Sequence, residues 1–299
     1  MARSIQNVSH SAVSEDERRR GLEVVAYARA SVRLEGFIPS AEAEDLARRY
    51  VDGEIDMVEF VKVSRRAPTA HRNEGTGADR QKIEADSTFI RIAELRDKPV
   101  RGDFDAAHLR EINRRIFQDL PGLGFADVTP GQYRPPVKGS GDWIKTRGFE
   151  TIPQASHVAY SRMDDAARVK LNKTLDAIYT LELSKLHVRE FTQALAKIYT
   201  ELDYLHPFSD GNSRTLREFT RQIADAAGYR VEWEWFARAP VGRDLLYIGR
   251  DLSVNEQALP EIGNQGTRRD VQYTLDMFEG NRALPDLLSD AVRRRPEGQ

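Results

Sequence analysis

The sequence predicts an all-α protein with one small β-hairpin. Apolar residues recur at helical spacing in a very regular stretch made of Val188, Phe191, Leu195, Ile198, Leu202 and Leu205. A second stretch has the same period and ends at Gly228, a residue typical of helix C-termini. The hairpin is predicted from the alternating segment Trp143 to Phe149, which lies in a region rich in glycine and proline.

Four segments follow from the distribution of apolar residues. Residues 1–63 predict a module of short helices, the first of which ends at Gly36 and the second at Gly53. Residues 64–86 have almost no apolar periodicity and predict a linker. Residues 87–250 predict the helical core, and residues 251–299 a C-terminal helical extension that ends in a solvated, arginine-rich tail.

Composition excludes several classes of function. The 299 residues include 45 basic and 47 acidic side chains, and a net charge of −2 gives no overall field that would gather nucleic acid or anionic lipid. The absence of cysteine excludes disulfides, thiolate metal sites and cysteine nucleophiles. No stretch approaches the roughly 20 apolar residues of a membrane helix. We therefore expect no nucleic-acid or membrane partner and a cytoplasmic protein, acting in its own cell or delivered into another.

The chemistry is concentrated in a turn between the two regular helices, from Pro207 to Asn212. The turn precedes a helix N-terminus, where free N–H groups and the helix dipole favour an anion, and Gly211 permits close approach of the backbone. Arg214 and Arg217 lie one helical turn apart and can both reach that anion.

The same turn supplies an acid and a base. Asp210 offers a hard oxygen ligand suited to Mg²⁺ that is shared with phosphates. His206 is placed to take a proton from an attacking hydroxyl. Each feature alone has an ordinary structural explanation, such as a packing histidine or a solvated pair of arginines. Together they indicate a site for phosphoryl or nucleotidyl transfer.

This turn resembles the signature of the Fic family, His-x-Phe-x-Asp/Glu-Gly-Asn-Gly-Arg-x-x-Arg. The positions that match are His206, Phe208, Asp210, Gly211, Asn212, Arg214 and Arg217. The resemblance implies transfer of AMP from Mg²⁺-bound ATP to a Ser, Thr or Tyr hydroxyl of a target protein.

The resemblance also implies roles for individual residues. His206 would be the base, Asp210 the metal ligand, and Gly211 with Asn212 the anion hole. Arg214 and Arg217 would bind the distal phosphates. The family carries a β-hairpin flap that aligns the target segment by strand addition, and the segment that contains Lys145, Thr146 and Arg147 is similar in placement.

Ser213 departs from the signature, which has a second glycine at this position. In a residue with ordinary helical φ the serine costs little, since serine is favourable near a helix start. If the glycine is needed for close approach to ATP, turnover suffers. AMP transfer is the leading interpretation; the alternatives are a weakened module that binds nucleotide or a partner, and a phosphotransferase variant.

A second motif lies near the N-terminus. Many Fic proteins carry Ser/Thr-x-x-x-Glu-Gly/Asn on a helix that obstructs the ATP site, and the sequence has it as Ser31, Glu35 and Gly36. The i, i+4 spacing puts Ser31 and Glu35 on one helix face, from which Glu35 could pair with Arg217. The surrounding module resembles the antitoxin partner of Fic toxins, so we predict autoinhibition; an exposed glutamate at a helix end is the alternative.

Two further predictions concern aromatic side chains and assembly. Trp233 and Trp235 are expected to pack in the core, with a place in the nucleobase pocket as the alternative. The oligomeric state and the identity of the target protein are left open by the sequence.

Overall fold

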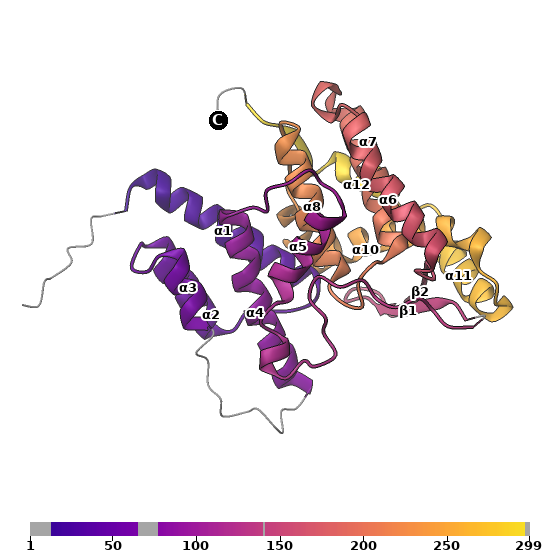
Figure 1. The fold of residues 1–299 in the computed structure, drawn as a ribbon, viewed down its shortest axis with the longest axis horizontal. Helices are drawn as coiled ribbons and strands as arrows, with labels where there is room; N and C mark the ends of the chain where they lie inside the picture. The colour runs from indigo at the N-terminus through magenta and orange to yellow at the C-terminus, as the bar shows by residue number, and fades with distance from the viewer. Residues whose placement is uncertain (1–12, 65–76, 140, 297–299) are drawn as a thin grey trace, which may run out of the picture.

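The computed structural model describes residues 13–64, 77–139 and 141–296. In these ranges the chain forms twelve α-helices and two small antiparallel strand pairs, which confirms the all-α prediction with one hairpin (Figure 1). The helices in chain order are α1 (Glu15–Leu34), α2 (Ala41–Val51), α3 (Met57–Ser64), α4 (Gly77–Asp97), α5 (Ala106–Phe117), α6 (Asp165–Thr180), α7 (Val188–Leu205), α8 (Asn212–Ala226), α9 (Glu234–Ala237), α10 (Pro240–Ala258), α11 (Gln265–Met277) and α12 (Leu284–Ser289). The strands are β1 (Trp143–Gly148), β2 (Ala155–Tyr160), β3 (Tyr229–Val231) and β4 (Val292–Arg294).

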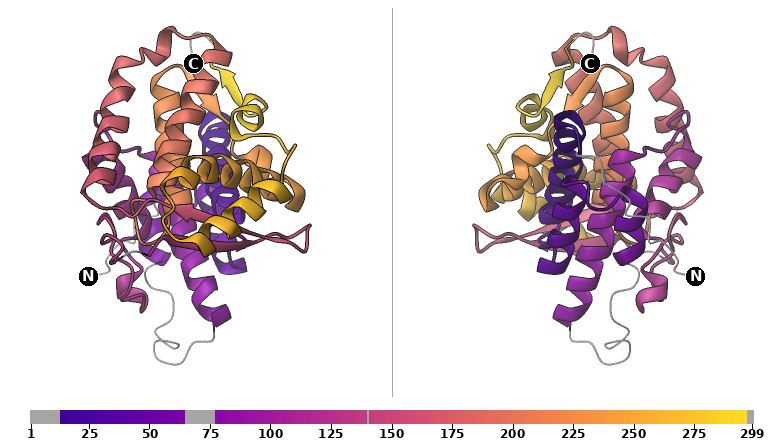
Figure 2. Two further views of the ribbon diagram at one scale, coloured as in Figure 1. Left: turned by 90° about the vertical axis from the view of Figure 1, so that its right-hand side faces the viewer. Right: turned by 90° about the vertical axis from the view of Figure 1, so that its left-hand side faces the viewer.

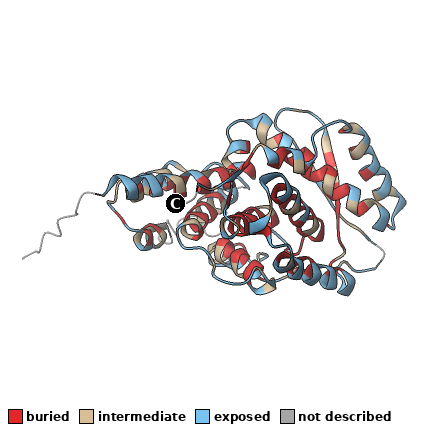
Figure 3. Cartoon of the chain, turned by 90° about the horizontal axis from the view of Figure 1, so that it is seen from above, coloured by how far each residue is buried: buried red, intermediate tan, exposed pale blue. Residues whose placement is uncertain are grey.

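Helices α7 and α8 form the centre of the molecule. Helix α7 packs against α6, α8, α10 and α12, and α5 covers another side of α8. Nearly every side chain of α8 is buried, including its polar ones, because neighbours surround it. Buried residues accordingly gather on the helices in the middle of the molecule (Figure 3). The loop between α7 and α8 is therefore buried at both ends, and only Ser209 and Asp210 within it are exposed.

The N-terminal helices share the same core. Helix α1 lies along α4 and also contacts α9, α2 and α8 (Figure 1). Its buried apolar residues Val24, Val25, Ala28, Val32 and Leu34 belong to the main hydrophobic cluster. Helix α1 is thus packed as an integral part of the core.

The predicted linker over 64–86 was wrong for its last ten residues, because α4 begins at Gly77. Residues 65–76 lie outside the described part of the chain. The first turns of α4 show no apolar periodicity because polar contacts hold them in place. Asp86 accepts from the Ser40 amide at 2.7 Å, and Glu84 accepts from Arg214 at 2.5 Å. The sequence pattern alone does not reveal such partners.

The hairpin forms as predicted. Strand β1 pairs with β2 in the register Lys145↔Val158, and β2 packs on α10 and α11. The hairpin lies at one side of the helical body, and its turn projects outward (Figure 2).

Residues 292–294 form β4 against β3, so the predicted tail is partly a strand, but Arg293 and Arg294 are exposed, as predicted for a solvated segment. Val292 is buried, but three residues are too short a run to show a strand pattern. Within the described ranges, no helix is both long and apolar enough to cross a membrane.

Candidate active site

The loop between α7 and α8 is bounded by two residues with left-handed backbone conformation. His206 ends α7 with φ 46°, and Gly211 precedes α8 with φ 72°. Between them, the Asn212 side chain accepts from the Phe208 amide at 2.9 Å and donates to the Phe208 carbonyl at 2.7 Å. The Asn212 side chain therefore fixes the loop, and only its backbone is left to line an anion nest.

Gly211 is required for two reasons. Its positive φ is costly for residues with a Cβ, and a Cβ built there would lie 1.9 Å from Cζ of Phe117. The close packing on Phe117 is a local reason for the glycine that the sequence does not show.

Asp210 is exposed at the same turn, and its Oδ1 accepts from the Gly211 amide at 2.7 Å. No group of three or more His, Asp or Glu side chains in the described ranges is arranged to hold a metal. A single exposed carboxylate fits Mg²⁺ that completes its coordination with phosphate and water, and does not fit a metal held by protein alone.

His206 is held as a buried, neutral imidazole. Its ring lies against Tyr160, with ring centroids 3.9 Å apart, and neither ring nitrogen has a hydrogen-bond partner. Nδ1 is 3.9 Å from Oδ1 of Asp203. Burial, and then the positive charges of Lys145 and Arg134, hold the pKa of His206 well below its ordinary value. A neutral imidazole with a free nitrogen can accept a proton.

Arg134 is a site residue that the sequence analysis missed. Its amide donates to the Pro207 carbonyl at 2.8 Å, and its Nε donates to the His206 carbonyl at 2.7 Å. The side chain is fully buried and lies 4.0 Å from the ring centre of Trp143. Arg134 thus clamps the loop from the segment before the hairpin. An arginine in a Gly- and Pro-rich stretch gives no sequence signal for this.

The two signature arginines are held by different N-terminal helices. Arg214 donates to Glu84 at 2.5 Å and to Thr88 at 3.2 Å, both on α4. Arg217 is completely buried and donates to Glu35 at 2.7 Å and to the Ser31 carbonyl at 2.8 Å, both on α1 or at its end. Nε of Arg214 and both Nε and Nη1 of Arg217 are buried without a partner. The pairing of Glu35 with Arg217 expected from the sequence is therefore present.

Glu35 is placed by the way α1 ends. Gly36 has φ 84°, the Gly36 amide donates to the Arg33 carbonyl and the Phe37 amide to the Val32 carbonyl, a Schellman motif that turns the chain after Glu35. The Glu35 carboxylate also accepts from the Tyr247 hydroxyl at 3.0 Å.

The Glu35 carboxylate is strongly stabilised in its ionised form. Burial alone would raise its pKa, but the guanidinium groups of Arg217, Arg214 and Arg250 lower the pKa of Glu35 to about 2. Glu35 is therefore an anion seated among cationic groups, and this excludes the alternative of an exposed helix end.

Ser213 lies in the first turn of α8 with ordinary helical φ. Its Oγ accepts from Nη2 of Arg250 at 3.0 Å. Arg250 is also bound to Asp203 of α7 by Nε and Nη2 at 2.9–3.0 Å. The serine therefore fits the helix and contacts a buried arginine from outside the loop.

The three flap residues predicted from the sequence lie on β1 with different surroundings. Arg147 points toward α10, where its Nε donates to Asp251 at 3.0 Å and its guanidinium lies 4.1 Å from the ring centre of Tyr247. Thr146 is exposed. Lys145 is half-buried, and its pKa is lowered by burial although Asp210 opposes that effect. Arg147 thus holds the hairpin to α10, whereas Lys145 faces the loop.

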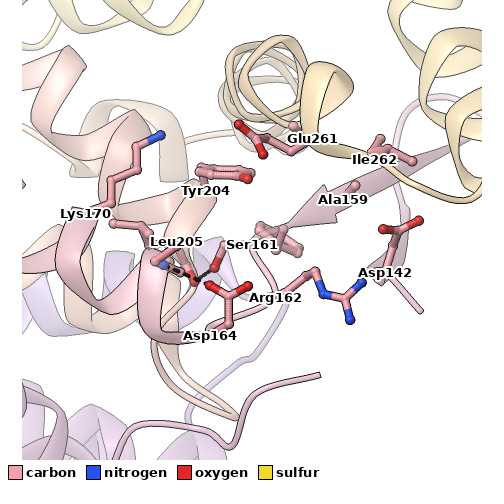
Figure 4. Close-up of a pocket in the computed structure, with 14 residues that line it drawn as sticks. Asp142, Ala159, Ser161, Arg162, Asp164, Lys170, Tyr204, Leu205, Glu261 and Ile262 are labelled. Atoms are coloured by element: carbon pink, nitrogen blue, oxygen red, sulfur yellow. Dashed lines mark hydrogen bonds between the residues drawn. The ribbon is translucent and has the colours of Figure 1, made fainter. Parts of the chain in front are cut away.

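Two cavities border the hairpin. The larger, of about 430 Å³, lies between the end of α1 at Gly36, residues 148–150 and the start of α10 at Arg243. The smaller, of about 170 Å³, is lined by Tyr160, Tyr204, Asp164, Lys170 and Glu261 (Figure 4). None of the predicted nucleotide-binding residues lines either cavity. The position beside Arg217 is filled by the carboxylate of Glu35.

The tryptophans differ in environment. Trp233 is completely buried against Tyr199 and Phe236, which confirms the core prediction for this residue. The prediction was wrong for Trp235, which is 45% exposed.

Two protein-family models match parts of this chain. Residues 103–224 match the Fic/DOC family, and residues 23–67 match the antitoxin VbhA family. The chain therefore contains a Fic domain together with a VbhA-type antitoxin domain.

The chain is similar to the protein adenylyltransferase VbhT of Bartonella schoenbuchensis, with 28% identity over 164 residues that make up 54% of this chain and 30% of VbhT. It is 30% identical over 148 residues to the probable protein adenylyltransferase Fic of Escherichia coli, which covers 49% of this chain and 62% of that protein. Among solved structures, the N-terminal Fic domain of a putative cell filamentation protein of Bartonella quintana, with bound ADP, aligns with a TM-score of 0.48 and 19% identity over 75% of this chain and 90% of that one. The chain thus spans less than a third of VbhT.

Proposed function

We propose that this protein transfers AMP from Mg²⁺-bound ATP to a Ser, Thr or Tyr hydroxyl of a target protein. The observation that carries the proposal is a buried His206 whose pKa is lowered by burial and by the charges of Arg134 and Arg250, two guanidinium groups that each have an Nη1 without a partner. Buried donors without partners are costly unless a ligand satisfies them, and a triphosphate supplies many acceptors. The relatives named above as adenylyltransferases support the same reaction.

In the proposed reaction, each residue of the site has a separate role. The target hydroxyl oxygen attacks the α-phosphorus, the new P–O bond forms, and the bond to the β-phosphate oxygen breaks, so that pyrophosphate leaves. His206 takes the hydroxyl proton. The backbone amides at the start of α8 stabilise negative charge on the phosphate oxygens, and Arg214 and Arg217 bind the distal phosphates. Mg²⁺, which neutralises phosphate charge when bound, would be held by Asp210.

The proposed resting state is inhibited by Glu35. Its carboxylate accepts from Nη2 of Arg217, so an anion already lies where Arg217 would bind a phosphate of ATP. Ser31 fixes the same guanidinium through its carbonyl, which makes α1 the inhibitory element. Residues 1–63 would then act as an antitoxin on the same chain, and 87–250 as the transferase, with 251–299 as its extension.

The target would bind along β1. In the described ranges this strand pairs only with β2, so its other edge offers backbone donors and acceptors to an added strand. Lys145 lies on that strand and faces the loop that contains Asp210. We further propose a cytoplasmic site of action, in the producing cell or in a cell that receives the protein as an effector.

The experiment compares wild-type protein with Glu35→Gly in lysate supplied with ATP labelled at the α- or the γ-phosphate. We expect adducts from the α-label only, much stronger in Glu35→Gly, and absent when His206→Ala is added. Glu59→Gly, on an exposed face of α3, is the matched control and should behave as wild type. Label from the γ-phosphate would indicate phosphate transfer, and ATP binding without any adduct would indicate a binding module; either result overturns the proposal.

A further inference from the structure

The buried arginine of α10 is unexplained by the signature. Arg250 is 1% exposed, and its fork binds Asp203 through Nε and Nη2. Nη2 also donates to Ser213, while Nη1 is buried without a partner. An ion pair between α7 and α10 needs neither the contact with Ser213 nor a pair of unsatisfied N–H groups. A buried N–H group without an acceptor destabilises the fold unless a ligand accepts its hydrogen bond.

The guanidinium of Arg250 lies beside the first turn of α8, where the anion is proposed to bind. Ser213 is in the first turn of α8, where the helix amides form the proposed nest, and Nη1 is attached to the same carbon as the Nη2 that touches Ser213. On its other side, Arg250 lies 4.7 Å from the ring centre of Tyr247, whose hydroxyl donates to Glu35. The charge of Arg250 also contributes to the lowered pKa of Glu35. Arg250 therefore contacts both the first turn of α8 and the tyrosine that donates to Glu35.

We propose that Arg250 is a third phosphate-binding guanidinium, supplied from outside the signature loop and positioned by Ser213. The ligand is the distal phosphate part of a nucleoside di- or triphosphate. Asp203 fixes the plane of the fork, and Ser213 fixes its rotation, so that Nη1 donates to a phosphate oxygen when Glu35 is displaced. The serine in place of the signature's second glycine is then part of the binding site, and its loss weakens ATP binding.

This inference rests on the proposed function, and its test is a binding measurement so that the two can fail separately. Calorimetry with Mg²⁺-ATP and with AMP is performed on Glu35→Gly/His206→Ala protein, which has the anion position free and no base. Adding Ser213→Gly or Ser213→Ala is expected to weaken ATP binding roughly three- to tenfold, and AMP binding by less than about twofold. AMP lacks the distal phosphates and serves as the internal control. Ser253→Ala, which removes only a bond to the Gly249 carbonyl within α10, should leave both affinities unchanged.

Arg250 itself is tested without leaving a buried charge unpaired. Arg250→Gln is combined with Asp203→Asn, since removing one partner of a buried pair is strongly destabilising. Relative to the Glu35→Gly/His206→Ala protein, the variant that also carries both substitutions should lose roughly tenfold or more in ATP affinity and little in AMP affinity. If it does not fold, the Ser213 variants decide the matter. Equal losses for ATP and AMP, or no loss in either serine variant, would overturn the assignment, whereas a missing AMP adduct in Glu35→Gly protein would overturn only the reaction.

Discussion

The ionisation of Glu35 makes the packing of α1 against the site dependent on pH. The substitution Glu35→Gln keeps the size of the side chain and removes its charge. Because the ionised form is favoured in the folded protein, the pKa falls from its ordinary value of 4.5 to about 2. At about 1.4 kcal/mol for each pH unit, that difference corresponds to about 3 kcal/mol of folding free energy at neutral pH.

The sign of the effect follows from the direction of the pKa change. A carboxyl group with a lowered folded pKa stabilises the fold above its unfolded pKa and loses that contribution as pH falls through the folded value. The difference in unfolding free energy between wild type and Glu35→Gln should therefore be about 3 kcal/mol at pH 7, about 1.4 kcal/mol at pH 3 and near zero below about pH 2. Subtracting the two proteins cancels the titration of all other groups.

Urea unfolding at pH 7, 5, 4 and 3, followed by circular dichroism, measures this difference. Glu59→Gln is the control: its carboxylate is exposed and 3.8 Å from Lys62, and exposed pairs contribute little. A difference for Glu35→Gln that stays constant from pH 7 to pH 3, or one no larger than the control's, would show that Glu35 is not held as a buried anion by the three arginines.

Three further outcomes are expected. Gly211→Ala should lose ATP binding in calorimetry and lower the melting temperature, because the residue has φ 72° and its Cβ would meet the ring of Phe117; unchanged binding would contradict the packing argument. The AMP-transfer rate of the Glu35→Gly form should stay flat from pH 7.5 to 6, because the pKa of His206 is well below 6.5, whereas an ordinary histidine base would lose more than half its activity. Arg147→Met should lower the melting temperature by several degrees, because it leaves Asp251 buried without its charge partner. The double variant Arg147→Met/Asp251→Asn should recover part of this loss. A melting temperature of Arg147→Met equal to that of the wild type would show that this ion pair does not hold the hairpin to α10.

The elements that could be predicted from the sequence are those fixed by local chemistry. The apolar period of α7 and α8 sets two helices, and the turn between them needs Gly211 at a positive φ. The Ser31 and Glu35 spacing with Gly36 at the helix end likewise depends only on helix geometry and on the Schellman motif. These signals are local, so they survive without knowledge of the fold.

The residues that the sequence analysis missed act across long separations in the chain. Arg134 reaches the His206 carbonyl, and Arg250 reaches Ser213 and Asp203 from another helix. Each arginine looks like a surface residue until tertiary packing buries it. The same reason accounts for the start of α4, whose Glu84 is a partner of Arg214 and has no apolar pattern to announce it.

The packing of α1 also limits how the proposed inhibition could be relieved. Detaching the helix would expose Val24, Val25, Ala28, Val32 and Leu34, and each large apolar side chain returned to water costs about 1.5–3 kcal/mol. Rotating the Glu35 side chain away from Arg217 costs only its ion pair, about 3 kcal/mol by the pKa argument above. The rotation of the Glu35 side chain, with α1 still in place, is therefore the change of lower free energy by which ATP could reach Arg217. Under this proposal Glu35 competes with ATP for Arg217, and the strength of the inhibition also depends on the hydrogen bond from Tyr247 and on the neighbouring charge of Arg250.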